Sequence, residues 1–245
     1  MDDHKPALLR TVVLAAGIAL AGFLAGQGLV RARTVDRFVT VRGLAEREVR
    51  ADLALWPLRV VAADNDLTRA QGQVRSNLQA VRQFLAQFGI DSTQTELQEL
   101  QVTDALANPW SQPERVTNRY VVRQTLMVRT IQLDQVIAAS QRTGDLVAVG
   151  VVVSSGEEYG GSGPTYLFTR LNDLKPEMIA EATAQARAAA EQFAADSDSR
   201  LGGIRQAQQG VFQILARDQA PGITEANQPN KLVRIVSTVE FYLRD

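Results

Sequence analysis

The chain has 245 residues, of which 45% are hydrophobic and 22% are charged, values typical of a folded globular protein. Its 26 basic and 27 acidic side chains leave a formal net charge of -1, so no overall field attracts nucleic acid or another polyanion. Cysteine is absent, and the single histidine, His4, precedes the folded part. The composition therefore excludes disulfides, thiolate metal sites, cysteine nucleophiles and histidine-based triads from that part.

The N-terminus has the layout of a membrane anchor or a signal peptide. Residues 1–10 carry Lys5 and Arg10 and form a cytoplasmic-type n-region, whereas residues 11–30 contain no charge. At about 1.5 Å per residue, a helix over residues 11–30 spans the roughly 30 Å hydrocarbon core of a bilayer. The run is longer than the usual apolar part of a cleaved signal, so we predict a retained transmembrane anchor. A signal peptide cleaved near residues 19–21 is the alternative.

A short polar linker at residues 31–37 separates this helix from a domain that we expect at residues 38–245. The arginines of the linker match the positive residues before the helix, so charge alone does not orient the helix in a membrane. From residue 38 onward the hydrophobic period alternates between two and about 3.6, which predicts strands and helices in turn.

The domain is expected to begin with two strands and a helix. A strand at residues 38–42 is followed by a turn at Gly43 and a long strand at residues 46–63. Pro57 lacks a backbone donor, so the long strand should be at an edge or bulged at that point. The next helix is predicted to start after Asp66 and to end before Gly89, because glycine is favoured at the position that follows a helix. Its inward stripe is predicted to be Val74, Leu78, Val81, Leu85 and Phe88.

The middle of the chain is predicted to contain several shorter elements. In order, they are a strand at 95–105, a proline-rich hairpin loop at 108–113, a strand at 117–130, a helix at 133–141, a strand at 146–154, a flexible turn at 156–163 and a strand at 165–169. Apolar and polar residues alternate in the strand at 117–130, which is typical of a half-buried antiparallel strand.

A long helix is predicted from residue 173 to residue 201, with Pro176 in its first turn and a stop at Gly202–Gly203. Its inward face is expected to consist of Ile179, Ala182, Ala186, Ala189 or Ala190, and Phe193. Strands at 210–215 and 231–243 follow, joined by a long loop at 219–230.

The fold class predicted from this order is α+β. Long antiparallel strands should carry helices packed on one face, in two similar ββαββ lobes joined by a short helix. The single N-terminal hydrophobic helix precedes them. We treat residues 38–245 as one domain because no linker-like stretch divides them.

No motif in the chain predicts a catalytic, cofactor or metal site. The glycine-rich turn at 156–163 lacks the ending of a phosphate loop, and Asp196–Ser199 lacks the glycine and glutamate of a calcium loop. The carboxylates considered for acid–base chemistry are Glu46, Glu48, Asp52, Glu96 and Glu99. Spacing alone does not bring them together, and an enzyme that uses carboxylates or Ser154 and Ser155 is kept as a second alternative.

Three arginines on one strand, Arg119, Arg123 and Arg129, loosely resemble a basic nucleic-acid surface. We expect them on the face opposite Tyr120, in a salt-bridged outer surface, so no nucleic-acid partner is predicted.

The two tryptophans are the predicted contacts with a partner. Trp110 lies in the proline-flanked loop, where an exposed indole is typical of a binding surface. Trp56 stands beside Pro57 in a strand, and a place in the core is its alternative.

Three segments resemble the SIMPL-domain family of bacterial envelope proteins. Val41–Ala54 is similar to the opening signature V-x-G-x-G-x-x-x-x-x-P-D-x-A, with Ala45 and Ala51 where the pattern prefers glycine and proline. Ala182–Gly203 is similar to the family's alanine-rich helix, and Val233–Leu243 to its C-terminal strand. The resemblance implies an extracytoplasmic domain with a βαββ-based fold behind a signal or anchor, as well as homo-oligomers, and it supplies no catalytic residues.

We therefore expect a single-pass inner-membrane protein whose domain faces the periplasm, or a secreted periplasmic protein if the signal is cleaved. It should act without catalysis, by self-assembly or by binding an envelope protein, in a role such as stress tolerance. Exposed sheet edges and the loops at 108–112 and 219–230 are the expected contacts. A periplasmic module that binds a small molecule or lipid is the first alternative.

Overall fold

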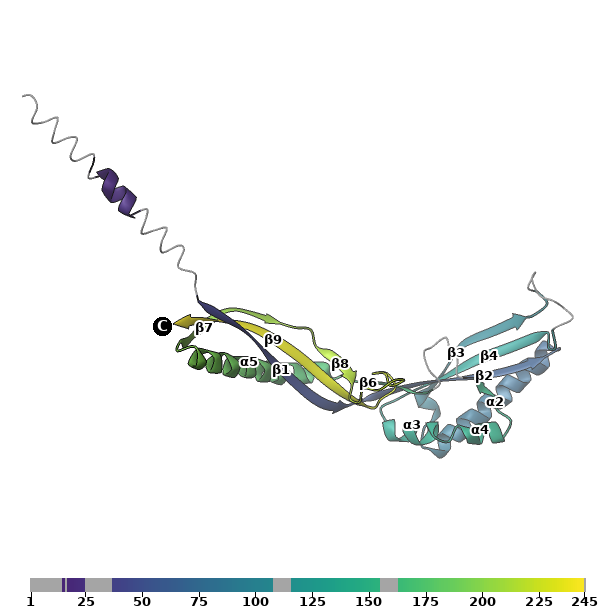
Figure 1. Ribbon diagram of the computed structural model, residues 1–245. Helices are drawn as coiled ribbons and strands as arrows, with labels where there is room; N and C mark the ends of the chain where they lie inside the picture. The colour runs from purple at the N-terminus through teal and green to yellow at the C-terminus, as the bar shows by residue number, and fades with distance from the viewer. Residues whose placement is uncertain (1–14, 16, 25–36, 108–115, 155–162, 245) are drawn as a thin grey trace, which may run out of the picture. The chain divides into compact units, whose positions relative to one another are not determined.

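The computed structural model describes residues 15, 17–24, 37–107, 116–154 and 163–244 (Figure 1). Residues 15 and 17–24 are helical, and none of the helices formed by the described residues combines the length and apolar character that a membrane crossing requires. The n-region, the ends of the predicted hydrophobic helix and most of the linker lie outside the described residues. Anchor or signal therefore stays a prediction.

The strands of the chain form two antiparallel sheets, and helices occur between the strands in the sequence. In chain order they are β1 (Phe38–Arg50), β2 (Leu53–Asp64), α2 (Leu67–Gln87), the 3-10 helix η1 (Ser92–Gln94), β3 (Thr95–Asp104), β4 (Tyr120–Thr130), α3 (Leu133–Ser140), α4 (Gly144–Ala148), β5 (Val153–Ser154), β6 (Thr165–Leu167), α5 (Leu171–Asp196), β7 (Arg200–Gln209), β8 (Gln213–Ala216) and β9 (Asn230–Arg244). The predicted α+β class with antiparallel strands is confirmed.

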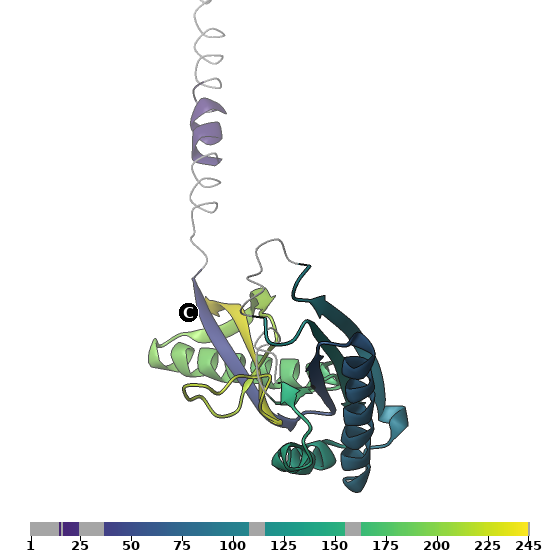
Figure 2. The same ribbon diagram turned by 90° about the vertical axis from the view of Figure 1, so that its right-hand side faces the viewer.

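One sheet has the order β1-β9-β7, with β8 also paired to β9, and the other has the order β3-β4-β2-β5, with β6 also paired to β2. The first strand of the domain thus joins the last, although β1 and β2 follow each other in the chain. Figures 1 and 2 show α5 along one face of the sheet that contains β9, and α2 along one face of the sheet that contains β2. The chain divides into two compact units, Met1–Gly43 with Thr183–Gln209 and Ser237–Asp245, and Leu44–Ala182 with Gly210–Val236.

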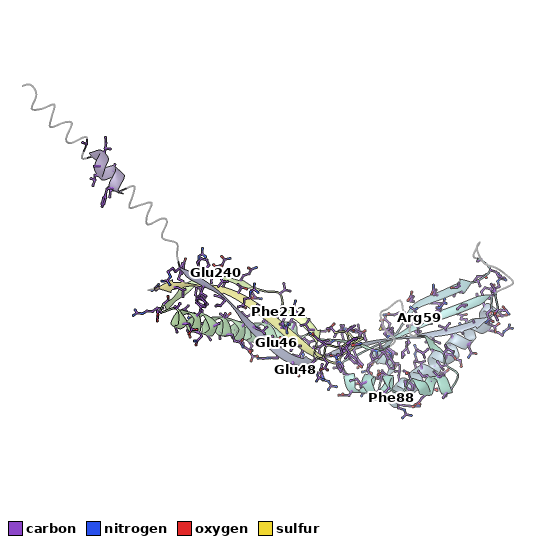
Figure 3. The ribbon with its side chains drawn as sticks, in the orientation of Figure 1. Glu46, Glu48, Arg59, Phe88, Phe212 and Glu240 are labelled. Carbon is purple, nitrogen blue, oxygen red and sulfur yellow. The ribbon has the colours of Figure 1, made fainter. Side chains whose placement is uncertain are left out.

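The helix α2 forms where the sequence predicts it. The side chain of Asp66 caps the helix by accepting the N–H groups of Thr68 at 2.8 Å and Arg69 at 3.1 Å. Gly89 follows the helix with φ +78°, a left-handed conformation that glycine adopts without strain. The predicted stripe is buried or half-buried, and Phe84 joins it by packing on the ring of Phe88 (Figure 3) at a centroid distance of 5.0 Å.

The sheet that contains β2 places one face of that strand in the core. Alternate residues of β2 point toward the helices α2, α3 and α4; they are Ala54, Trp56, Leu58, Val60 and Ala62. Pro57 pairs with Met127 of β4 on one side. On the other side, the described partners reach only residues 53–55 and 59–60 of β2, so Pro57 lies at a local edge, as predicted.

The predicted turn at Gly43 is wrong, because β1 continues through Gly43 to Arg50. Gly43 is buried and extends the inward alternation of its strand, so nothing interrupts the ladder there. The chain turns instead at Ala51 and Asp52, whose N–H groups donate to the carbonyls of Pro229 at 2.7 Å and Leu167 at 2.9 Å. The predicted strand at 46–63 is therefore two strands that enter different sheets.

The predicted strand at 146–154 is mostly wrong, because α4 occupies its first part and only the two residues of β5 are extended. Leu146 is 1% exposed and fills the core from a helical turn. Gly150, at φ +82°, ends that turn. The N–H of Gly150 donates to the carbonyl of Val147, and the N–H of Val151 donates to the carbonyl of Leu146, each at 3.0 Å. This pair of hydrogen bonds is the Schellman motif, which commonly ends a helix at a glycine.

The long helix α5 ends at Asp196, before the predicted stop at Gly202–Gly203, which lies inside the strand β7. Asp198, with φ +52°, turns the chain before that strand. The buried residues of α5 follow steps of four: Met178, Ala182, Ala186, Ala190 and Ala194. Phe193 falls one position off this row and is 52% exposed, so its predicted inward place is wrong. The strand predicted at 231–243 is confirmed as β9, in which Val233, Ile235, Val239 and Phe241 are buried.

Candidate interaction surface

The carboxylates considered for acid–base chemistry lie in separate places. Glu46 of β1 (Figure 3) forms an ion pair with Arg234 of β9 at 2.5 Å. Glu99 in β3 pairs with Arg59 of β2 at 3.6 Å. Among the described residues, no cluster of histidine, cysteine, aspartate or glutamate is arranged to hold a metal ion.

Asp52 lies at the junction between β1 and β2. Its side chain is 18% exposed and lies 3.3 Å from Arg170, while its two oxygens also accept hydrogen bonds from Thr169. Ser154 pairs with Arg59 in the short strand β5, and Ser155 lies outside the described residues.

The two tryptophans differ in what the structure describes. Trp110 lies outside the described residues, so its contact with a partner stays a prediction. Trp56 is 2% exposed and packs in the core beneath α2, which is the alternative that the sequence left open. A side chain so deeply covered stabilises the domain and offers no surface to a partner.

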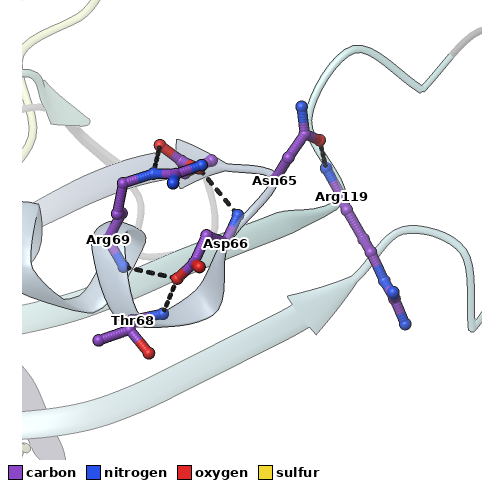
Figure 4. A network of polar contacts seen from close by, with 6 residues as sticks. Asn65, Asp66, Thr68, Arg69 and Arg119 are labelled. Atoms are coloured by element: carbon purple, nitrogen blue, oxygen red, sulfur yellow. Dashed lines mark hydrogen bonds and ion pairs between the residues drawn. The ribbon is translucent and has the colours of Figure 1, made fainter.

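The stem of the hairpin that bears Trp110 is held by charged hydrogen bonds. Arg119 donates from Nε and Nη2 to the carboxylate of Asp104, at 3.2 and 3.0 Å, and its N–H donates to Asn65 at 2.9 Å (Figure 4). Nearby, Arg69 donates to Asp64 at 2.7 Å, so the end of β2 and the start of α2 are joined to the stem. Fork-shaped arginine contacts of this kind restrict orientation as well as distance.

These arginines change the pKa values of their partners. Hydrogen bonding from Arg119 holds the pKa of Asp104 below its ordinary value, and Arg69 does the same for the pKa of Asp64. Arg119 also lies over the ring of Tyr120, 4.9 Å from its centroid, so our expectation that it is separated from this aromatic residue is wrong. Arg123 hydrogen-bonds Thr103 at 3.5 Å, and Arg129 is exposed.

The predicted contact loop at 219–230 is tied to the rest of its unit. Lys231 at the start of β9 is completely buried and bonds Glu225 of the loop, with 2.5 Å between Nζ and Oε1. The carbonyls of Ala226 and Pro229 accept the N–H groups of Tyr166 at 2.8 Å and Ala51 at 2.7 Å. A partner would therefore meet a fixed loop.

The strand β3 pairs only with β4 among the described residues and ends its sheet. Eight of its ten residues are exposed. Three of them are large and apolar: Leu97 at 46%, Leu100 at 55% and Val102 at 48%. We call these three residues the β3 ledge.

The β3 ledge lies on the face of the sheet that carries the helices. Leu97 is opposite Leu126 of β4, and Val102 is opposite Val122, two residues of the core. A bulge at Glu99, which has φ +43°, adds one residue and so keeps Leu100 on the same face. Because α2 packs chiefly over β2 and β4, the ledge projects beyond it and remains uncovered in the described chain.

The two elements beside this ledge have opposite charges. The helix α2 contains Arg69, Arg75 and Arg82 and no acidic residue. The strand β3 contains Glu96, Glu99 and Asp104 and no basic residue. Arg75, Arg82 and Glu96 are exposed and make no ion pair with the described residues. The arginines of α2 are on the side of the sheet that bears the ledge, whereas Glu96, which is opposite Met127, faces the other side.

Comparison with known proteins places most of this domain in one family. The model of the SIMPL family, described as "Protein of unknown function (DUF541)", matches residues 39–239. No curated protein matches the chain.

Proposed function

We propose that this chain, which belongs to the SIMPL family, is a membrane-tethered extracytoplasmic protein that acts by self-assembly or partner binding in the cell envelope. The exposed edge of β3 with its apolar ledge supports this proposal most directly. A strand that ends a sheet exposes a row of backbone N–H and C=O groups along its free edge, and an added strand would form hydrogen bonds with these groups. The ledge would contribute burial of apolar area to the same contact.

The charge-free run at residues 11–30 supports the tether, because it is long enough for a bilayer and follows a short stretch that carries Lys5 and Arg10. Stress tolerance is the physiological setting that we propose for the assembly. Protease treatment of spheroplasts tests the orientation: a domain outside the cytoplasm is degraded, whereas protection of the domain in intact spheroplasts would reject it.

The fragment 31–245 tests self-assembly by size-exclusion chromatography with light scattering. We expect a mass above that of a monomer, and a return toward the monomer in the double variant Leu100→Lys with Val102→Lys, because charges then occupy the ledge. The matched control is Val211→Lys, an apolar residue that is 85% exposed outside the ledge. A strictly monomeric fragment at high protein concentration would contradict self-assembly.

Partner binding is tested with the hydrophobic helix retained. Membrane extracts are passed over the full chain and over the Leu100→Lys, Val102→Lys variant, and captured proteins are compared. We expect an envelope protein that the wild type and the Val211→Lys control retain and the ledge variant loses. A monomeric chain with no such ledge-dependent protein would reject both forms of the proposal.

A further inference from the structure

A hollow of about 610 Å³ opens on the side of the sheet away from the β3 ledge. It is lined by residues of β2, η1, β3 and the end of β4, and its size lies in the range of small-molecule sites. This site is independent of the assembly proposed above, because it uses the opposite face of the same strands.

The floor of the hollow is apolar. Leu53 is 8% exposed, and Leu55 and Met127 beside it are half-buried. Ile131, which is 77% exposed, stands at the rim. A ligand that lies on this floor would bury apolar area of its own and cover these side chains.

One wall of the hollow is held rigidly by hydrogen bonds. The Nε2 atom of Gln94 donates to Thr130 Oγ1 at 2.8 Å and to Gln132 Oε1 at 3.1 Å. Its Oε1 atom accepts the N–H of Asp91 at 3.1 Å. The wall is therefore formed before any ligand arrives, which lowers the entropy cost of binding.

The rim carries one positive and one negative side chain that no described residue pairs with. Glu96 lies opposite Met127 in the ladder, so Arg129, two residues further along β4, is its diagonal neighbour on the same face. The backbone positions of diagonal neighbours of this kind are about 7–8 Å apart. Neither side chain makes a hydrogen bond or ion pair with the described residues. Both are exposed and free to bind opposite charges of a ligand.

We propose that this hollow binds a short apolar peptide with free termini. The peptide carboxylate pairs with Arg129, its ammonium group pairs with Glu96, and its apolar side chains lie on Leu55 and Met127. At about 3.3–3.6 Å per residue, two or three residues of a peptide span the roughly 7–8 Å between the backbone positions of Glu96 and Arg129. Guanidinium binds carboxylate in a fork geometry, which selects the direction of the peptide.

Isothermal titration calorimetry on the full chain tests this site with leucyl-leucine as the probe. Its uncharged analogue, N-acetyl-leucyl-leucinamide, should bind at least about tenfold more weakly, because each charged hydrogen bond that is lost costs about that factor. Arg129→Gln and Glu96→Gln should each reduce the affinity for leucyl-leucine by about tenfold. Arg42→Gln, which removes an exposed arginine outside the hollow, is the matched control and should leave the affinity unchanged.

A double variant distinguishes a charge effect from damage to the fold. In Glu96→Arg with Arg129→Glu the charges are exchanged, so the peptide should bind in the reverse direction with most of its affinity restored. Equal binding of the charged and uncharged peptides, no heat of binding with leucyl-leucine, or failure of the exchanged variant to recover would each overturn the assignment. Phosphoethanolamine is titrated in parallel, and tighter binding of this lipid headgroup than of leucyl-leucine would also overturn it.

Discussion

The carboxylate of Asp52 accepts two hydrogen bonds from Thr169, one from its backbone N–H at 2.9 Å and one from its hydroxyl at 3.0 Å. Asp52 follows β1 and precedes β2, whereas Thr169 stands between β6 and α5. The contact therefore joins the place where the chain passes from one sheet to the other with the start of the long helix. Asp52 also stands at the aspartate position of the opening signature of the SIMPL family. Its bonds show a structural role for that residue.

Replacement of Asp52 should destabilise this junction. In Asp52→Ala the N–H and hydroxyl of Thr169 lose their acceptor, and we expect a loss of about 1–3 kcal/mol in the free energy of unfolding. Urea denaturation of the variant and of Glu191→Ala provides the comparison. Glu191 is exposed on α5, so its replacement should change the free energy by at most about 0.5 kcal/mol. Equal stability of the two variants would show that the junction does not depend on Asp52.

Two adjacent glycines of β7 should respond differently to alanine. A Cβ atom at Gly202 would lie 2.9 Å from the backbone oxygen of Tyr242, whereas a Cβ at Gly203 would meet nothing within 4 Å. We expect Gly202→Ala to cost about 1–3 kcal/mol of stability because backbone must move. Gly203→Ala should stay within about 0.5 kcal/mol of the wild type. Thermal unfolding followed by circular dichroism measures both, and the opposite ranking would refute the observed register of β7 on β9.

The buried lysine depends on its partner. Lys231 is 0% exposed, and its ammonium group is bonded to Glu225. In Glu225→Ala the buried ammonium group keeps only its hydrogen bond to the backbone carbonyl of residue 225, and we expect a cost of about 1–3 kcal/mol. Lys231→Met keeps an apolar stem and needs no partner, so it should cost less. Chemical denaturation of the two single variants decides the order, and a larger loss in Lys231→Met would show that the ion pair itself stabilises the loop.

Acid should weaken the contacts of Asp104 and Asp64 at the ends of β3 and β2. The pKa values of Asp64 and Asp104 are lowered in the folded chain, so the unfolded chain binds their protons at a higher pH than the folded chain does. The stability that these carboxylates contribute is therefore present above the unfolded pKa of about 3.9 and is lost as the pH falls through the lower, folded values. Melting temperatures measured from pH 6 downward (about one pH unit per step) should fall less steeply in Asp64→Asn with Asp104→Asn than in the wild type. Parallel curves would rule out this linkage.

Local signals predicted the elements whose ends and faces are encoded by neighbouring residues. The stripe of α2, its cap at Asp66 and its end at Gly89 appear in the structure as the spacing predicts. The alternation of β9 likewise matches its buried face. In each case the deciding contacts lie within a few residues or follow one regular period.

Local patterns failed where distant contacts decide between two conformations. Residues 144–148 are β-branched in part, yet they form a helix because that turn places Leu146 in the core. The glycines at 202 and 203 look like a helix end, but the close approach of Tyr242 requires Gly202 within a strand. The β3 ledge was not predicted, and the bulge at Glu99 explains why, since it breaks the period of two at the point that matters.

The sequence by itself determined that this is an α+β chain with a charge-free N-terminal run and without thiol or imidazole chemistry in its folded part, because composition and short-range periodicity do not depend on which segments meet. Only the tertiary structure decided that β1 joins β9, that Trp56 is buried and that β3 carries an uncovered apolar edge. Strand pairing brings together residues far apart in the chain, and no local period encodes the identity of the partner strand.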